Sequence, residues 1–208
     1  MIPVRVLAVR YLAGASPALC RALGAPEGYS SLGMLTTDFD DATYIALDAA
    51  TKAADVEVSY GRSFYAGAAN ASTPNAGEVI GILAGQTPGA VRSGMDAALT
   101  ALQRVGFEET KGVPFLAHTV SSVGSFLAKE AQVPLGSAIA YLIAPPLEGM
   151  YAMDAALKAA DVRLCKLYAP PSETNFGGGL LSGTQSACEA ACAAFREKVA
   201  EVAAQPLQ

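Results

Sequence analysis

The sequence predicts an α+β protein built as a tandem duplication of one small domain, each copy a small sheet flanked by helices. The stretch ALDAATKAADV at residues 46–56 recurs as AMDAALKAADV at residues 152–162, with nine of the eleven positions identical. The two copies are 106 residues apart, close to half of the 208-residue chain. This period exceeds the about 20–50 residues of solenoid repeats. It fits two complete domains, and both halves follow the same order of predicted elements.

The first half is expected to alternate strands and helices, with one long loop before its last strand. Apolar alternation over residues 4–11 is typical of a strand, while Ser16-Pro17 and Thr87-Pro88 have the chemistry of helix starts. Three acids stand before the helix that carries the repeat and offer N-caps for it: Asp38, Asp40 and Asp41. The expected elements are strand 4–11, helix 16–24, strand 31–35, helix 41–54, strand 56–60, loop 61–77, strand 79–84 and helix 87–102.

The second half repeats this order after a predicted linker, QRVGFEETKGV, at residues 103–113. The predicted domains are therefore residues 1–106 and residues 107–208. The second set of elements is strand 114–120, helix 123–131, strand 138–144, helix 147–160, strand 161–168, loop 169–179, strand 180–182 and helix 184–203. Three consecutive glycines at 177–179 are expected to make this loop the most flexible point of the chain.

Composition narrows the class of protein. The chain is 52% hydrophobic and 16% charged, which is apolar for a water-soluble domain, yet no run approaches the about 18 apolar residues of a membrane span. Extensive subunit interfaces would account for the surplus apolar content. A net charge of −5 argues against a nucleic-acid partner. Arg5 and Arg10 interrupt the N-terminal apolar run, so no signal peptide is expected.

The four cysteines show no disulfide framework. Cys188 and Cys192 share a face of the last predicted helix and could begin a metal site, but the chain has a single histidine, His118, in a predicted strand. We expect reduced cysteines packed as small hydrophobic residues, with no metal and no cofactor.

Several longer strings carry a family resemblance: DFDDATYIALDAATKAADVEVSYGRSFYAGAANAS, AYLIAPPLEGMYAMDAALKAADV and PPSETNF. They resemble the L-type shell subunit of ethanolamine-utilisation bacterial microcompartments, over nearly the whole chain. The resemblance implies two circularly permuted microcompartment-shell domains in tandem. It also implies a homotrimer that mimics a hexamer and has a gated central pore for metabolites or a cofactor. A structural and transport role follows, with no enzymatic activity, in a microcompartment shell in the cytoplasm among other shell proteins.

The acids before the first repeat helix have two interpretations. One acid there is explained by capping and by the helix dipole, whereas two adjacent carboxylates also attract a small cation such as an ammonium group. The resemblance adds that Asp40, Asp41 and Glu78 line a small pore that takes ethanolamine. It further implies that Phe107 is an apolar wall of that pore, with Thr174, Asn175 and Phe176 contributed by the second half.

The two long loops also have two interpretations, as plain hairpin connections or as pore gates. The repeat places one loop at the same point of each half, and the resemblance favours gates. The gating residues would be Tyr65, Asn70, Thr73 and Asn75 in the first loop, and Asn175, Phe176, Gly177 and Gly178 in the second.

Two other functions stay open from the residues alone. An enzyme could use Asp40, Asp41 and Glu78 as acid/base groups, although no nucleophile or known catalytic motif accompanies them. A corrinoid-binding module would take cobalamin, for which the chain shows no motif. His118 is most simply a sheet residue.

Overall fold

A computed structural model describes residues 1–64, 75, 77–170 and 172–207. Contacts divide the chain into two units, which are described separately. The N-terminal unit comprises Pro3–Val105 together with Gly124–Leu127, and the C-terminal unit comprises Met1–Ile2, Gly106–Val123 and the residues from Ala128 onward. Each unit therefore includes a short segment from the other half of the chain.

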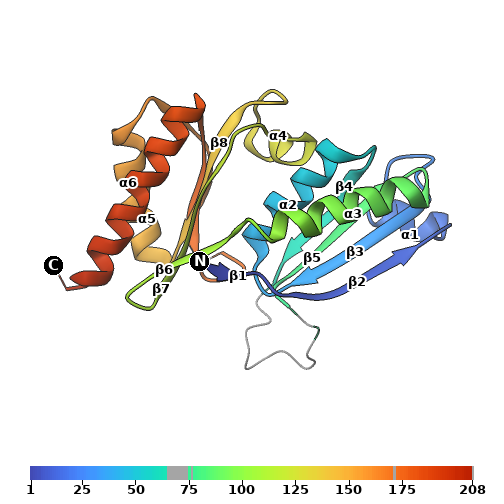
Figure 1. Cartoon of the computed structure of the whole chain (residues 1–208), viewed down its shortest axis with the longest axis horizontal. Coiled ribbons are helices and arrows are strands. Elements are labelled where there is room, and N and C mark those ends of the chain that lie inside the picture. Colours follow the sequence, from blue (N-terminus) through green and yellow to red (C-terminus); the bar gives the residue numbers. More distant parts are fainter. Residues whose placement is uncertain (65–74, 76, 171, 208) are drawn as a thin grey trace. The chain divides into compact units, whose positions relative to one another are not determined.

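The N-terminal unit is a four-stranded antiparallel sheet with the order β2-β3-β5-β4 (Figure 1). Its elements are β2 (Val6–Leu12), α1 (Pro17–Ala22), β3 (Ser31–Thr37), α2 (Asp40–Ala53), β4 (Glu57–Ser63), β5 (Val79–Gly85) and α3 (Pro88–Leu102). Successive strand residues face opposite sides of the sheet, so Leu83 packs with α2 and α3, whereas Ile82 and Ala84 pack with Cys20 of α1. Ala46 and Ala50 are fully buried in the α2 face.

The C-terminal unit is a six-stranded sheet with the order β1-β6-β7-β8-β10-β9, antiparallel from β6 onward. Its elements are β1 (Ile2–Pro3), β6 (Gly106–Thr110), β7 (Val113–Val120), α4 (Ser125–Ala131), β8 (Ala138–Ala144), α5 (Pro146–Ala159), β9 (Val162–Tyr168), β10 (Gly177–Gly183) and α6 (Gln185–Ala204). Helices α5 and α6 lie side by side against this sheet (Figure 1). Their core includes Leu142, Cys188, Cys192 and Phe195.

The predicted duplication is confirmed by the strand orders. The four strands β7-β8-β10-β9 repeat the order β2-β3-β5-β4, with helices at the same points of each series. The repeated sequence forms α2 and α5, in which Ala152 and Ala156 are buried as their counterparts are. The fourteen helices and strands expected from the sequence all occur, with ends within a few residues of the predicted ones.

Three local expectations are wrong. The predicted linker 103–113 contains a strand, β6, which forms a hairpin with β7. Residues 61–63 continue β4 instead of starting a loop. Gly177, Gly178 and Gly179 are buried residues of β10, hydrogen-bonded to β8 on one side with Gly178 and Gly179 also paired with β9 on the other, so they are not the flexible point of the loop. None of the helices in the described residues is long and apolar enough to cross a membrane.

Candidate functional site

Three predicted acids come together in the N-terminal unit. Asp40 and Asp41 are the first two residues of α2, and Glu78 directly precedes β5. The Glu78 N–H donates to the Thr37 carbonyl at the end of β3 (2.9 Å), which places Glu78 beside the strand that leads into α2. Both aspartates are almost fully buried within the chain. The sequence separation of 37 residues is closed by the β3–β5 pairing, which Gly77 permits by its positive φ of 64°.

The acids do not cap the helix in the predicted way. The N-cap residue of α2 is Phe39, and its side chain makes no capping hydrogen bond. Asp40 and Asp41 occupy the first turn, where carboxylates complement the helix dipole. The turn before α2 is instead held by Thr37 and Thr43, whose hydroxyls are 2.6 Å apart, with Thr43 donating to the Phe39 carbonyl (2.8 Å).

Burial makes this cluster electrostatically costly. Desolvation raises the pKa of Asp40, although a hydrogen bond from Ser63 works against the rise. Desolvation also raises the pKa of Glu78, to about 7, and the charges of Asp40 and Asp38 add to the effect. Near neutral pH the Asp40 and Glu78 carboxyls therefore resist ionisation unless a cation joins them.

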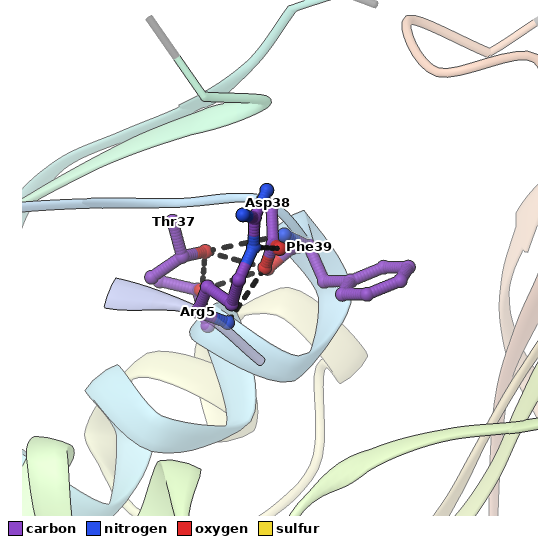
Figure 2. Close-up of polar contacts among 5 residues, drawn as sticks. Arg5, Thr37, Asp38 and Phe39 are labelled. Carbon is purple, nitrogen blue, oxygen red and sulfur yellow. Dashed lines mark hydrogen bonds and ion pairs between the residues drawn. The ribbon is translucent and has the colours of Figure 1, made fainter. Parts of the chain in front are cut away.

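Asp38, the fourth acid of this region, already has its cation. Its carboxylate accepts from the Arg5 backbone N–H and from Arg5 Nε, both at 2.8 Å. Figure 2 shows this pair next to the Thr37–Phe39 turn, with the Phe39 ring pointing away from the polar contacts. Arg5 therefore neutralises Asp38 locally.

The remaining predicted ligand residues lie in the C-terminal unit. Phe107 is buried in β6, and its ring meets the Phe176 ring edge-on, with 5.9 Å between centroids. Thr174 is buried, whereas Asn175 is exposed and has a left-handed φ of 64°. The predicted ligand residues thus form two groups. The three acids lie in the N-terminal unit, and the other four residues lie in the C-terminal unit.

Ser172 is a structural residue of this site that the sequence analysis missed. Its hydroxyl accepts from the N–H of Phe176 (3.1 Å) and of Thr174 (3.4 Å), and its carbonyl accepts from the Asn175 N–H (3.3 Å). One serine therefore shapes the turn that presents the three predicted residues. The available signal was a serine two residues before Thr174 in PPSETNF, a spacing typical of serine-stabilised turns.

Most of the first predicted gate lies outside the described residues, namely Tyr65, Asn70 and Thr73. Asn75 is described and is an exposed turn residue. In the second loop, the last residue before β10 is Phe176, and Gly177 and Gly178 belong to the strand. His118 lies in β7, as expected for a sheet residue. Among the described residues, no three His, Cys, Asp or Glu side chains are arranged to hold a metal ion.

Comparisons with known proteins assign the family. Residues 31–114 match the model of the BMC domain. The chain is 54% identical to the bacterial microcompartment shell protein EutL of Clostridium perfringens (strain 13 / Type A), covering 100% of this chain and 97% of that one. The crystal structure of ethanolamine utilization protein EutL from Leptotrichia buccalis C-1013-b superposes with a TM-score of 0.96 at 54% identity, over 100% of this chain and 97% of that one. The trimeric microcompartment shell protein PduB shares the fold, with a TM-score of 0.80 at 20% identity, over 96% and 89% of the two chains.

These matches run the full length of both units, and the likeness in sequence agrees with the likeness in fold. The predicted shell role is confirmed, and the enzyme interpretation of the three acids is set aside. The chain belongs to the EutL family of bacterial microcompartment shell proteins.

Proposed function

We propose that three copies of this chain form a pseudohexameric shell tile with a gated central pore, and that ethanolamine binds at Asp40, Asp41 and Glu78. The clustering of three poorly solvated carboxyls in the N-terminal unit carries the binding proposal. The printed name of a relative, an ethanolamine utilization protein, supports ethanolamine as the small cation.

An ammonium group suits this cluster chemically. It carries one positive charge and three N–H donors, which can be shared among several carboxylate oxygens. Its arrival lowers the cost of ionising Asp40 and Glu78, whose pKa values are raised by burial. The site is therefore better matched to a bound cation than to water alone.

Removing the charges should abolish ethanolamine binding without unfolding the chain. We expect the double variant Asp41→Asn/Glu78→Gln to lose measurable binding in isothermal titration calorimetry, because each lost charged hydrogen bond weakens affinity by about tenfold or more. A matched control is Asp96→Asn/Glu109→Gln, which removes two exposed charges elsewhere and should bind as the wild type does. Full affinity in the first variant would place the site elsewhere.

Affinity should also depend on pH through Glu78. Because its pKa in the folded chain is about 7, the side chain is half protonated at neutral pH and must lose that proton to pair with an ammonium group. Calorimetry should show affinity rising from about pH 6 to about pH 8, with proton release on binding.

The folding stability of the free protein should depend on pH in the opposite direction. Because the pKa of Glu78 is higher in the folded state, the folded state holds the proton more tightly than the unfolded state does. The contribution of Glu78 to stability therefore falls as the pH rises from about 4.5 to about 7. Glu78→Gln should remove both effects, and an unchanged pH profile in that variant would assign them to another group.

The C-terminal group offers complementary chemistry. The half-buried Phe176 ring, which packs edge-on against the buried Phe107 ring, provides an apolar surface suited to two methylene groups. Thr174 and Asn175 provide a hydroxyl and an amide suited to the alcohol. Thr174→Val keeps the volume and removes the hydroxyl. We propose that it weakens ethanolamine binding by less than the charge-removing variant does.

The gate is proposed for the two equivalent loops. The second loop has a defined turn held by Ser172, with Gly177 and Gly178 as its fixed base in β10. A ligand that contacts Thr174 or Asn175 shifts the gate only by its preference for one loop arrangement. About 1.4 kcal/mol of preference for the closed arrangement changes the open fraction roughly tenfold. Saturating ethanolamine should then slow proteolysis within residues 169–176, and unchanged cleavage would separate the ligand from the gate.

The trimer is the simplest closed assembly for this duplication. Two similar units per chain and three chains supply six units around one axis. The PduB relative is itself described as trimeric. Sedimentation velocity at micromolar concentration should give a single trimeric species, and a monomer would overturn the shell-tile proposal.

A further inference from the structure

A buried aspartate in α2 binds the start of α4 inside the N-terminal unit. The two carboxylate oxygens of Asp48 accept from the Gly124 N–H (2.7 Å) and the Leu127 N–H (2.8 Å). Thr51, one turn further along α2, accepts from the Ser125 N–H through its hydroxyl (3.1 Å). The carboxylate of Asp48 is fully buried. This is a complete helix cap, supplied by a residue more than 70 positions away in the chain.

Apolar contacts accompany the cap. Leu127 is 1% exposed, and the Phe126 ring lies 5.8 Å from the Tyr44 ring of α2, centroid to centroid. The segment Gly124–Leu127 is therefore bound to α2 by both charge and burial. The duplication raises the question of what occupies the equivalent face of α5.

The element equivalent to α4 is α1, and the backbone fixes their register. The Ala25 N–H donates to the Cys20 carbonyl (2.9 Å), and the Val133 N–H donates to the Ala128 carbonyl (3.0 Å), at a constant offset of 108 residues. The residues just before these two donors both have positive φ, 70° and 51°. At this offset Leu19 corresponds to Leu127.

The counterparts of the bound residues are left exposed. Asp154 of α5 corresponds to Asp48, yet its side chain is 65% exposed and pairs with Lys158 four residues on. Leu19 of α1 is 41% exposed, although its counterpart Leu127 is buried. No side chain caps the N-terminus of α1 within the described residues. Both halves of the contact are thus present, and both are exposed within one chain.

The residues around this contact change together between the two halves. Where Ser125 donates an N–H to the Thr51 hydroxyl, the counterparts are Pro17, which has no N–H, and Leu157, which has no hydroxyl. The polar pair Ser125–Thr51 thus corresponds to the apolar pair Pro17–Leu157, so both members of the pair differ. Such a matched replacement is expected when the two counterparts face each other, because a lone donor or acceptor buried there would cost free energy.

We propose that Asp154 of one copy caps the N-terminus of α1 of a second copy, accepting from the Leu19 N–H and burying the Leu19 side chain. The proposal rests on the trimer of the proposed function and specifies its contact. The contact is heterologous, since α5 of each copy meets α1 of the next, and three repetitions close a ring.

The proposed contact between α1 and α5 of two copies differs slightly in spacing from the contact between α4 and α2 within one chain. A Cβ atom at Gly124 would lie 2.7 Å from the Asp48 carbonyl oxygen, and Ser16 at the equivalent position has a Cβ atom. Helix α1 must therefore sit slightly further from α5 than α4 sits from α2. For this reason Asp154 accepts from the Leu19 N–H, at the third residue of α1.

The first test measures the strength of the ring. Asp154→Ala and Leu19→Ser should each raise the concentration at which the trimer dissociates by about tenfold or more, measured by sedimentation velocity over a dilution series. Lys158→Ala is the matched control, because it removes the intrahelical partner but keeps the carboxylate, and its trimer should be as tight as the wild type. Circular dichroism at each dilution confirms that the variants stay folded.

The second test asks which chain supplies each side. Ala18 and Met150 correspond to the ring pair Phe126 and Tyr44, so they should lie close together across the interface. Chains carrying Ala18→Cys and chains carrying Met150→Cys are co-expressed and treated with a short bis-maleimide. A covalent dimer of chains is expected only when both variants are present, and each single variant reports the background from native cysteines.

The outcomes separate this inference from the trimer itself. A wild-type trimer that is indifferent to Asp154→Ala and gives no dimer in the co-expression would overturn this contact and leave the trimer standing. A monomeric wild type would overturn both. Cross-linking within a single monomeric chain that carries both cysteines would show that α1 meets α5 in its own copy, which also overturns the inference.

Discussion

Replacing Gly178 with alanine should destabilise the C-terminal unit by about 2–5 kcal/mol. Gly178 has a φ of 153°, which L residues rarely adopt, and a Cβ atom there would overlap the Leu142 carbonyl oxygen of β8. Backbone strain costs about 1–2 kcal/mol, and overpacking against a rigid neighbouring strand adds about 1–3 kcal/mol. Chemical denaturation at fixed protein concentration should show the loss as an earlier transition.

Gly112→Ala separates these two contributions. Gly112 also has a positive φ, 81°, but no atom lies within 4 Å of its would-be Cβ atom. Alanine there should cost only about 1 kcal/mol, because strain acts without overlap. Equal stability losses in the two variants would show that the close approach of β10 to β8 is unimportant.

Replacing Asp48 with alanine should destabilise the N-terminal unit by about 3 kcal/mol. The substitution removes a helix cap, worth about 0.5–2 kcal/mol, and a second charged hydrogen bond, worth about 1.5–3 kcal/mol. Two backbone N–H groups at the start of α4 then lose their acceptor in a buried location. Hydrogen exchange should show the Gly124 and Leu127 amides losing protection along with the fall in stability.

Asp96→Ala is the control for this substitution. Asp96 lies on the exposed side of α3, and loss of an exposed charge changes stability by about 0.5 kcal/mol or less. If Asp48→Ala were equally mild, the hydrogen bonds to α4 would be replaceable by water, and the segment 124–127 would be held by its apolar contacts alone.

The duplication was the most informative property of the sequence. Asp48 and Asp154, together with matching lysines and valines, fixed the offset, and the offset predicted two similar units with the same order of helices and strands along the chain. Strand 138–144 was predicted to the residue, since its apolar run ends at two prolines that stop it. The local pattern was therefore sufficient to predict the ends of an element wherever residues next to it in the sequence, such as these prolines, stop it.

Strand β6 was missed because its stability comes from outside its own sequence. Glu108 and Glu109 suggest an exposed linker, but Arg196 of α6 binds Glu108 through two hydrogen bonds of 2.6 and 2.7 Å. The turn to β7 is made by Lys111 and Gly112, both with positive φ. A charge pair separated by 88 residues leaves no local pattern.

The site was only partly accessible from the sequence. The acids at the start of α2 were visible as a pair, and Glu78 came from the family resemblance; its position beside Thr37 depends on the β3–β5 pairing. The repeat also suggested that Asp48 and Asp154 are equivalent, whereas one is fully buried and the other is mostly exposed. Sequence identity reports a common ancestor of the two helices and does not report what each helix contacts.

The placement of residues 124–127 has a consequence for synthesis. The N-terminal unit contains all its strands by residue 85, but the amide groups that satisfy Asp48 lie at residues 124 and 127. A ribosome must therefore translate well past the first repeat before that buried charge finds its donors. Until then the Asp48 carboxylate has the Lys52 ammonium nearby, at 3.5 Å, but lacks its two backbone donors, so folding of the first repeat should be completed late. Expressing the first half alone should accordingly give an unstable fragment, however domain-like its sequence.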